Sequence, residues 1–229
     1  MGPRQDHRGR PGAAARARLQ RLSGHRLLEV APERLERWVT GFADRHGDVR
    51  CDATPDAVRL DARDGASAVL EVPWPPLDPA ERTVAGLARH SLQPRLALLV
   101  LVRRGGYGAG LARDGRLLDH RVGTRYVQGR TAAGGWSQQR FARRRSGQAA
   151  QLERAAADAV RSVLGRAPRT PDVVVPGGDR LLVAAVLDAL PDVAALPRGP
   201  LLDVRDPRLV VLQDAAQRAR AVRVQLTEP

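Results

Sequence analysis

The feature that most constrains the fold is a run of seven consecutive apolar residues, Leu-Ala-Leu-Leu-Val-Leu-Val, at residues 96–102. A run of this length between turn residues is typical of a buried central strand, and it is far shorter than the roughly 20 residues that cross a bilayer. A glycine turn and the Asp114-Gly115 pair separate it from two more expected strands, at residues 107–112 and 116–122. The sequence therefore predicts a three-stranded antiparallel meander.

The elements expected after the meander alternate between helix and strand. In chain order they are a basic loop (residues 123–136), a long helix (137–164), a strand (172–175), a helix (179–190), a strand (201–204), a helix (207–219) and a last strand (222–226). Three antiparallel strands followed by helix, strand, helix and strand is the order of an RNase H-like core. The predicted fold class is therefore α/β with a mixed sheet, although a fold alone does not fix a function.

Three regions are expected along the chain. Residues 1–22 are Arg, Ala, Gly and Pro without periodicity, which indicates a disordered basic tail. Residues 23–92 suggest a small N-terminal α/β unit, with a helix between Pro32 and Gly47 and a hairpin turn at Asp64-Gly65. Residues 93–229 are expected to form the RNase H-like domain, with the C-terminal helix and strand included.

The charge is concentrated in two segments. The chain has 229 residues and a formal net charge of +13, of which residues 1–21 contribute +5 and residues 121–145 contribute +7. A nearly neutral body with two arginine-rich segments indicates an anionic partner, with nucleic acid the first candidate. The single cysteine excludes a disulfide framework and a multi-cysteine metal site, so a cytoplasmic protein is expected.

The sequence lacks the residues that several common classes of enzyme require. The glycines at residues 105–110 do not fit GxGxxG and precede a strand, which indicates a closely packed hairpin. The sequence contains no P-loop motif and no GxSxG elbow, and its five histidines are scattered. The strand at 96–102 has no carboxylate, which argues against a two-metal nuclease on this fold. No metal or organic cofactor is expected.

The segment that carries chemistry is residues 134–145, which read Gly-Gly-Trp-Ser-Gln-Gln-Arg-Phe-Ala-Arg-Arg-Arg. Two glycines free the backbone, and Ser137 is a good N-cap for the long helix. A flexible tip with a neutral amide, followed by arginines at i, i+3 and i+4, suits entry into an RNA-walled cavity. The competing interpretation is a glycine turn before an ordinary helix with a solvated arginine face.

This segment resembles the GGQ loop and following helix of the middle domain of eukaryotic and archaeal peptide chain release factors. It is more similar to the Vms-like release-factor group, peptidyl-tRNA hydrolases of ribosome rescue whose tip resembles Gly-Gly-Ser-Gln. The actinobacterial branch of that group fits a composition without Lys, Ile or Asn. The resemblance covers about residues 95–205, and that middle domain is RNase H-like.

The resemblance implies a site and a set of partners. An ungapped comparison places Trp136 at the release-factor glutamine, whereas matching Ser-Gln places the catalytic glutamine at Gln138, with Gln139 and Gln128 as alternatives. The implied catalytic residues are Gly134, Gly135, Gln138 and Gln139, and the expected RNA-binding residues are Arg130, Trp136, Ser137, Arg140, Arg143 and Arg144. The implied partners are the large ribosomal subunit, peptidyl-tRNA and rRNA, and the implied reaction is metal-independent release of the nascent peptide.

Three other functions stay open from the sequence. The same loop would serve cleavage of the tRNA near its CCA end, or the arginines would serve a non-catalytic RNA- or ribosome-binding module. A small-molecule enzyme would use the Pro176-Gly177-Gly178 turn, at a helix N-terminus, as an anion site. The oligomeric state is left open.

Overall fold

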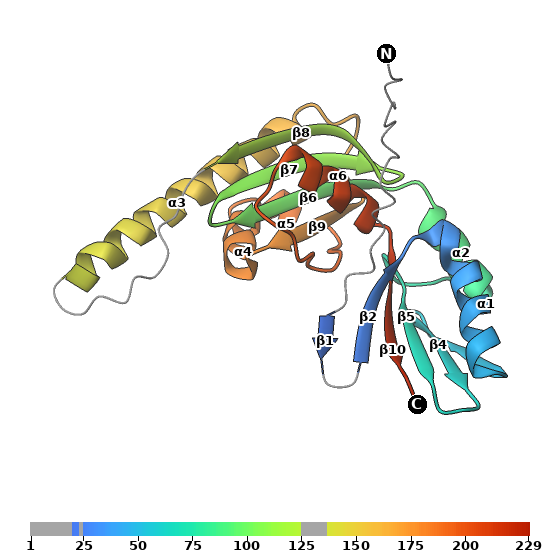
Figure 1. The fold of residues 1–229 in the computed structure, drawn as a ribbon. Helices are drawn as coiled ribbons and strands as arrows, with labels where there is room; N and C mark the ends of the chain where they lie inside the picture. Colours follow the sequence, from blue (N-terminus) through green and yellow to red (C-terminus); the bar gives the residue numbers. More distant parts are fainter. Residues whose placement is uncertain (1–19, 23–24, 125–136) are drawn as a thin grey trace, which may run out of the picture.

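The computed structural model describes residues 20–22, 25–124 and 137–229, with side chains at 26–124 and 147–229. These residues form a six-stranded sheet and a four-stranded sheet, each covered by helices (Figure 1). None of the helices in this part of the chain combines the length and apolar character needed to cross a bilayer.

The six-stranded sheet is antiparallel throughout, in the order β1-β2-β10-β5-β4-β3. Its strands are β1 (Gln20–Leu22), β2 (His25–Val30), β3 (Val49–Ala53), β4 (Ala57–Ala62), β5 (Ser67–Glu71) and β10 (Val222–Thr227). Helices α1 (Leu35–His46) and α2 (Val84–Leu92) cover one face, and short 3-10 turns, Pro32–Arg34 and Pro79–Glu81, precede them (Figure 1). Phe42 and Leu35 of α1 are fully buried in the core beneath.

The chain termini differ from the expectation. Residues 222–226 were expected to close the C-terminal domain, but Val224 of β10 pairs with Leu28 of β2 and Leu70 of β5. The alternating residues Val222, Val224 and Leu226 are apolar and buried, and they complete the N-terminal core. Residues 20–22, assigned to the disordered tail, form β1, and β2 is a strand that the sequence analysis did not predict.

The four-stranded sheet has the order β8-β7-β6-β9. Its strands are β6 (Leu96–Arg103), β7 (Gly106–Arg113), β8 (Arg116–Thr124) and β9 (Val173–Gly178). The first three form the predicted antiparallel meander, and β9 is parallel to β6. Helices α3 (Ser137–Leu164), α4 (Arg180–Asp188) and α5 (Pro191–Ala194) lie on one face, and α6 (Leu209–Arg218) lies on the other (Figure 1).

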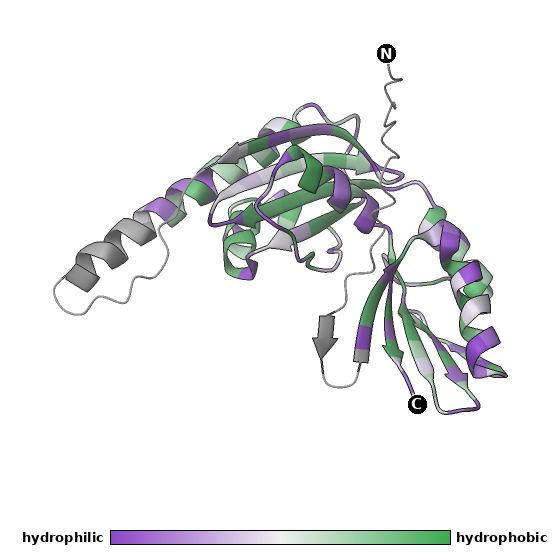
Figure 2. Ribbon diagram, viewed as in Figure 1, coloured by the Kyte–Doolittle hydropathy of each residue, from purple (hydrophilic) through white to green (hydrophobic). Residues whose placement is uncertain are grey.

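Strand β6 is buried on both faces, as its sequence predicts. Leu98 and Val100 belong to the core shared with α3 and α4, whereas Leu99 and Leu101 belong to the core shared with α6. Figure 2 shows β6 hydrophobic along its length, in contrast to the more polar edge strand β8. Each buried leucine contributes roughly 1.5–3 kcal/mol relative to an exposed one.

The predicted fold class is therefore confirmed: a mixed α/β core of three antiparallel strands, helix, strand and helix, beside a small N-terminal α/β unit. The fifth strand expected at residues 201–204 is reduced to a single bridge between Leu202 and Gly177. Because the chain turns away toward α6 after this bridge, no longer ladder forms.

An ion pair joins α6 to the six-stranded sheet. The Nε of Arg218, in the last turn of α6, donates to Oε2 of Glu29 in β2 at 2.6 Å, and its Nη2 donates to Oε1 at 2.9 Å. Its Nη1 also donates to the carbonyl of Asp203 at 2.9 Å. The hydrogen bond with Glu29 raises the pKa of Arg218 more than burial lowers it, so Arg218 keeps its positive charge. This two-point, partly buried contact fixes α6 against the first sheet.

We expect Arg218→Met to lower the free energy of unfolding by about 1–3 kcal/mol, because Glu29 loses a charged partner while the apolar stem is kept. Urea denaturation measures the change. The matched control is Arg59→Met, which removes an exposed pair with Asp61 within β4 and should leave stability almost unchanged. Equal losses in the two variants would contradict a role for Arg218 in joining the sheets.

Candidate functional site

The C-terminal half of α3 fixes this helix on the sheet. The 28-residue helix is about 42 Å long at 1.5 Å per residue. Its residues Leu152, Ala156, Val160 and Val163 are buried in the core against β7, β8 and α4. Their spacing of i, i+4, i+8 and i+11 puts these four positions on one face of the helix.

The N-terminal half of α3 extends beyond the sheet (Figure 1). Gly147 is exposed, and Leu152 is the first residue of α3 that is buried among those with described side chains. The fifteen residues before it, 137–151, span about 22 Å. We call these residues the projecting segment. Its length was not predicted, although the sequence signals it, because residues 142–151 contain no large apolar side chain.

The projecting segment extends past the edge of the four-stranded sheet where three strand ends meet (Figure 1). Thr124, the last residue of β8, pairs with Gly106, the first residue of β7, and Gly106 also pairs with Arg103 at the end of β6.

The predicted site divides between described and undescribed residues. Gln128, Arg130, Gly134, Gly135 and Trp136 lie outside the described residues. The remaining predicted site residues lie in the first turns of α3, where the backbone is described: Ser137, Gln138, Gln139, Arg140, Arg143 and Arg144. The helix thus brings these six positions together within about 12 Å along its axis.

The charge of the projecting segment is unfavourable for an isolated helix. It carries four arginines and no acidic residue, near a helix N-terminus that already bears partial positive charge. Arg140 and Arg144 are four residues apart, a spacing at which like charges repel by roughly 0.2–0.5 kcal/mol. By helical periodicity, positions 140 and 143 lie opposite the face that carries Leu152 and Val163. An anion bound to the segment would offset this repulsion.

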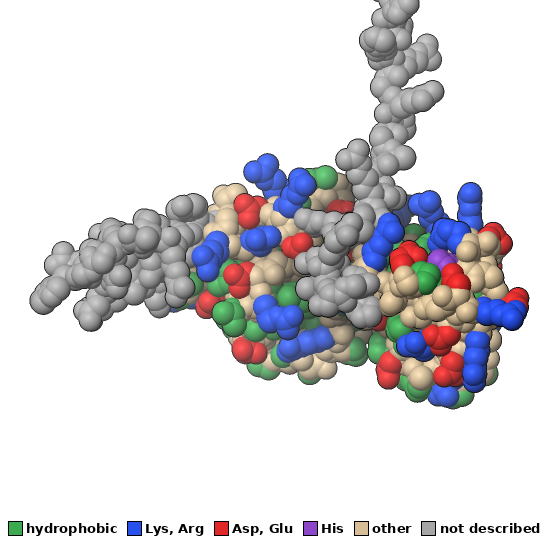
Figure 3. All heavy atoms as spheres, turned by 60° about the horizontal axis from the view of Figure 1, so that its bottom comes forward, with side chains coloured by type: hydrophobic (Ala, Val, Ile, Leu, Met, Phe, Trp, Pro, Cys, Tyr) green, Lys and Arg blue, Asp and Glu red, His purple; other side chains and the backbone are tan. Residues whose placement is uncertain are grey.

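The rest of the described surface is not similarly one-sided. On the face in Figure 3, arginine and acidic side chains of the described residues are intermixed. Outside residues 1–21 and 121–145 the formal net charge is +1. The basic character of the chain is therefore concentrated in the tail and around the start of α3.

The glycines of the meander have a structural role. A Cβ atom on Gly108 or Gly110 would lie within 3.4 Å of side chains in α6 or in the neighbouring strand β8. Strands β6 and β7 form the predicted hairpin. The short distances around its glycines confirm the close packing that the sequence predicts.

At the alternative anion site, Pro176-Gly177-Gly178, the backbone donors already bind a side chain of the protein itself. The side chain of Asp179 accepts hydrogen bonds from the backbone N–H groups of Leu181 and Leu182, at 3.1 and 3.3 Å. These are the donors that an anion would use, and a carboxylate beside them repels a second negative charge. This interpretation of the turn is wrong. Within residues 26–124 and 147–229, no cluster of three His, Cys, Asp or Glu side chains suits a metal ion.

A comparison with known proteins matches the chain to one family. A family model described as the Actinobacteria/chloroflexi VLRF1 release factor matches residues 94–225, more than half of the chain. Among solved structures, the mitochondrial localization core of Vms1 is similar, with 10% identity, a TM-score of 0.37, and coverage of 84% of this chain and 80% of that one. Pelota of Archaeoglobus fulgidus is similar at 11% identity, with a TM-score of 0.32 and coverage of 89% and 65%. No curated protein matches.

If the arginines of the projecting segment bind RNA as the sequence predicts, Arg143→Glu combined with Arg144→Glu should weaken that binding and change the slope of log Kd against log salt by about two units, because two phosphate contacts would be lost. Filter binding over a series of salt concentrations measures this slope. The control, Arg154→Glu with Arg161→Glu, makes the same charge change on the anchored half of α3. If both double variants changed the slope equally, the projecting segment would have no particular role in RNA binding.

Proposed function

Because the chain belongs to the Actinobacteria/chloroflexi VLRF1 release factor family, we propose that it releases nascent peptides from tRNA on stalled large ribosomal subunits. The reaction is hydrolysis of the ester bond between peptide and tRNA. Its partners are peptidyl-tRNA and the rRNA that surrounds that bond.

The observation that supports this function is the projecting segment of α3. A helix anchored by a buried core extends about 22 Å before Leu152, its first fully buried residue among those with described side chains. The motif at residues 134–139 stands at the far end of that helix in sequence. A reactive bond enclosed by RNA requires a narrow protein element of this kind, since a whole domain cannot approach it.

The chemistry requires positioning more than proton transfer. Water adds to the ester carbonyl carbon, the bond to the ribose oxygen breaks, the peptide leaves as a carboxylate and the ribose regains its hydroxyl. Gln138 orients the water or stabilises the developing negative charge through its backbone or side-chain amide, while Gly134 and Gly135 let the backbone reach the bond. A neutral amide is a weak base, so its contribution is orientation and charge stabilisation.

The arginines of the segment hold it against RNA. Arg140, Arg143 and Arg144 contact phosphates, and Arg130 and Trp136 extend this contact toward the tip. Guanidinium groups bind phosphate oxygens at two points, which fixes the orientation of the helix as well as its position. The mutual repulsion of these arginines in the free protein is relieved in the complex.

We expect Gln138→Ala to release peptide at least about 100-fold more slowly than the unmodified protein, in line with the loss of one stabilising donor. A release assay on stalled large-subunit–peptidyl-tRNA complexes measures the rate, and sedimentation with the subunits confirms binding. Gln139→Ala tests the alternative catalytic position and should stay within a few-fold of the unmodified rate, whereas loss of release in Gln139→Ala alone would move the site by one residue. Release at the full rate by Gln138→Ala would overturn the assignment.

The same assay separates the alternatives when the tRNA product is sized on a denaturing gel. An intact 3′ end supports ester hydrolysis. A shortened tRNA would instead indicate cleavage near the CCA end. Binding without any product from the unmodified protein would indicate a non-catalytic ribosome-binding module.

A further inference from the structure

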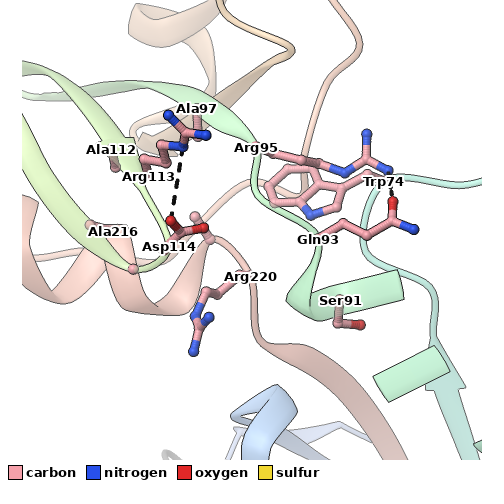
Figure 4. A pocket seen from close by; sticks show the side chains of 12 residues that line it. Trp74, Ser91, Gln93, Arg95, Ala97, Ala112, Arg113, Asp114, Ala216 and Arg220 are labelled. Atoms are coloured by element: carbon pink, nitrogen blue, oxygen red, sulfur yellow. Dashed lines mark hydrogen bonds and ion pairs between the residues drawn. The ribbon is translucent and has the colours of Figure 1, made fainter. Parts of the chain in front are cut away.

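Ion pairs are unevenly distributed over the four-stranded sheet, although the formal net charge outside the two basic segments is only +1. At the edge where β6 begins and β7 turns into β8, four arginines are paired with carboxylates. The pairs are Arg113–Asp114 (Figure 4), Arg166–Asp119, Arg169–Asp172 and Arg220–Glu33. The charge of these arginines is therefore compensated within the protein.

The opposite edge, which α3 extends past, carries exposed arginines without such partners. They come from the turn between β6 and β7, the start of α4, and the chain that leads into α6. They are Arg104, Arg180, Arg205 and Arg208, and none of them forms an ion pair within residues 26–124 and 147–229. We call these four residues the edge arginines.

Hydrogen bonds hold the three segments that carry the edge arginines together. The N–H of Asp179, directly before α4, donates to the carbonyl of Val102 in β6 at 2.8 Å. The Nη1 of Arg103, at the end of β6, donates to the carbonyl of Val204 in the chain before α6 at 2.6 Å. The edge arginines therefore belong to one continuous surface, although they are about 100 residues apart in sequence at the extremes.

The acidic residues of the same three segments already contact other parts of the protein. The carboxylate of Asp179 accepts hydrogen bonds from the first N–H groups of α4. Oδ1 of Asp203 is 4.0 Å from Nη1 of Arg103. Asp206 packs against the turn between β6 and β7, because a Cβ atom on Gly105 would lie 2.8 Å from its Oδ2. The positive charge of the edge arginines is left for a partner outside this fold.

Two of the edge arginines occupy positions that the helix dipole makes unfavourable for a cation. Arg180 is the first residue of α4, and Arg208 is the N-cap residue of α6, which has no side-chain cap. Acidic or small polar residues are favoured there, because the helix N-terminus bears partial positive charge. A bound anion would offset this cost, as it would in the projecting segment. Residues that break a local rule in this way are typical of functional surfaces.

We propose that the edge arginines are a second RNA-binding surface, which binds phosphate groups of the RNA that the projecting segment enters; the choice of RNA rests on the proposed function. Guanidinium groups bind phosphate oxygens at two points. The three segments, residues 103–105, 179–181 and 203–208, contain no aromatic residue to stack on a base, so the contact is with the RNA backbone. RNA held at the projecting segment and at the edge would fix the direction of α3 as well as its position.

The test is filter binding of a short RNA duplex over a series of salt concentrations. Arg104→Gln combined with Arg208→Gln should weaken binding about tenfold and change the slope of log Kd against log salt by about two units, because two phosphate contacts are lost. The matched control is Arg63→Gln combined with Arg116→Gln. Arg63 lies between β4 and β5, Arg116 begins β8 at the opposite edge, and both are exposed without an ion pair in the described part of the chain. The control should stay within about twofold of the unmodified protein.

Equal losses in the two double variants would overturn the proposal, because the edge arginines would then act only through net charge. Arg104→Lys combined with Arg208→Lys keeps both charges and should retain the slope, and a slope lost in this variant as well would contradict charge as the cause. A loss confined to one of two unrelated duplex sequences would contradict backbone contacts. Because the readout does not involve peptide release, full release by Gln138→Ala would overturn the catalytic assignment and leave this result intact.

Discussion

The burial of the C-terminal half of α3 is the interaction on which the candidate site depends. Leu152, Ala156, Val160 and Val163 lie in one core with β7, β8 and α4, and they fix the axis of a helix whose first fifteen residues extend beyond that core. A helix is stiff over this distance, whereas an isolated loop of equal length is not. The anchored half therefore determines where the backbone of residues 137–139, at the start of the helix, lies.

The two sheets depend on each other through the end of the chain. After α6 the backbone crosses to the first sheet, where β10 lies between β2 and β5. The Arg218–Glu29 pair fixes the same crossing. A small pocket lined by Trp74 and Arg95 lies at this junction (Figure 4), so its shape exists only when both sheets are formed and joined.

The sequence predicted local elements well and distant pairings poorly. The bounds of α3 and the meander of β6, β7 and β8 followed from apolar periodicity and from the Asp114-Gly115 turn, which act between neighbours in the chain. The place of β10 in the six-stranded sheet could not be predicted, because alternating apolar residues identify a strand but not its partner. The motif in α3 was found from its residues and its resemblance to release factors. The pocket was missed because its lining comes from four stretches that lie far apart in sequence, at residue 74 and at residues 91–97, 112–115 and 216–220.

The central claim is that an anchored helix of fixed length positions the motif. The most direct test is the rate of peptide release by a variant with a helical heptad, Glu-Ala-Ala-Ala-Gln-Ala-Ala, inserted after Gly147. Seven residues lengthen the projecting segment by about 10 Å and nearly preserve its rotational phase. The account predicts that this variant keeps its melting temperature but releases peptide at least tenfold more slowly. Release at the unmodified rate would contradict it.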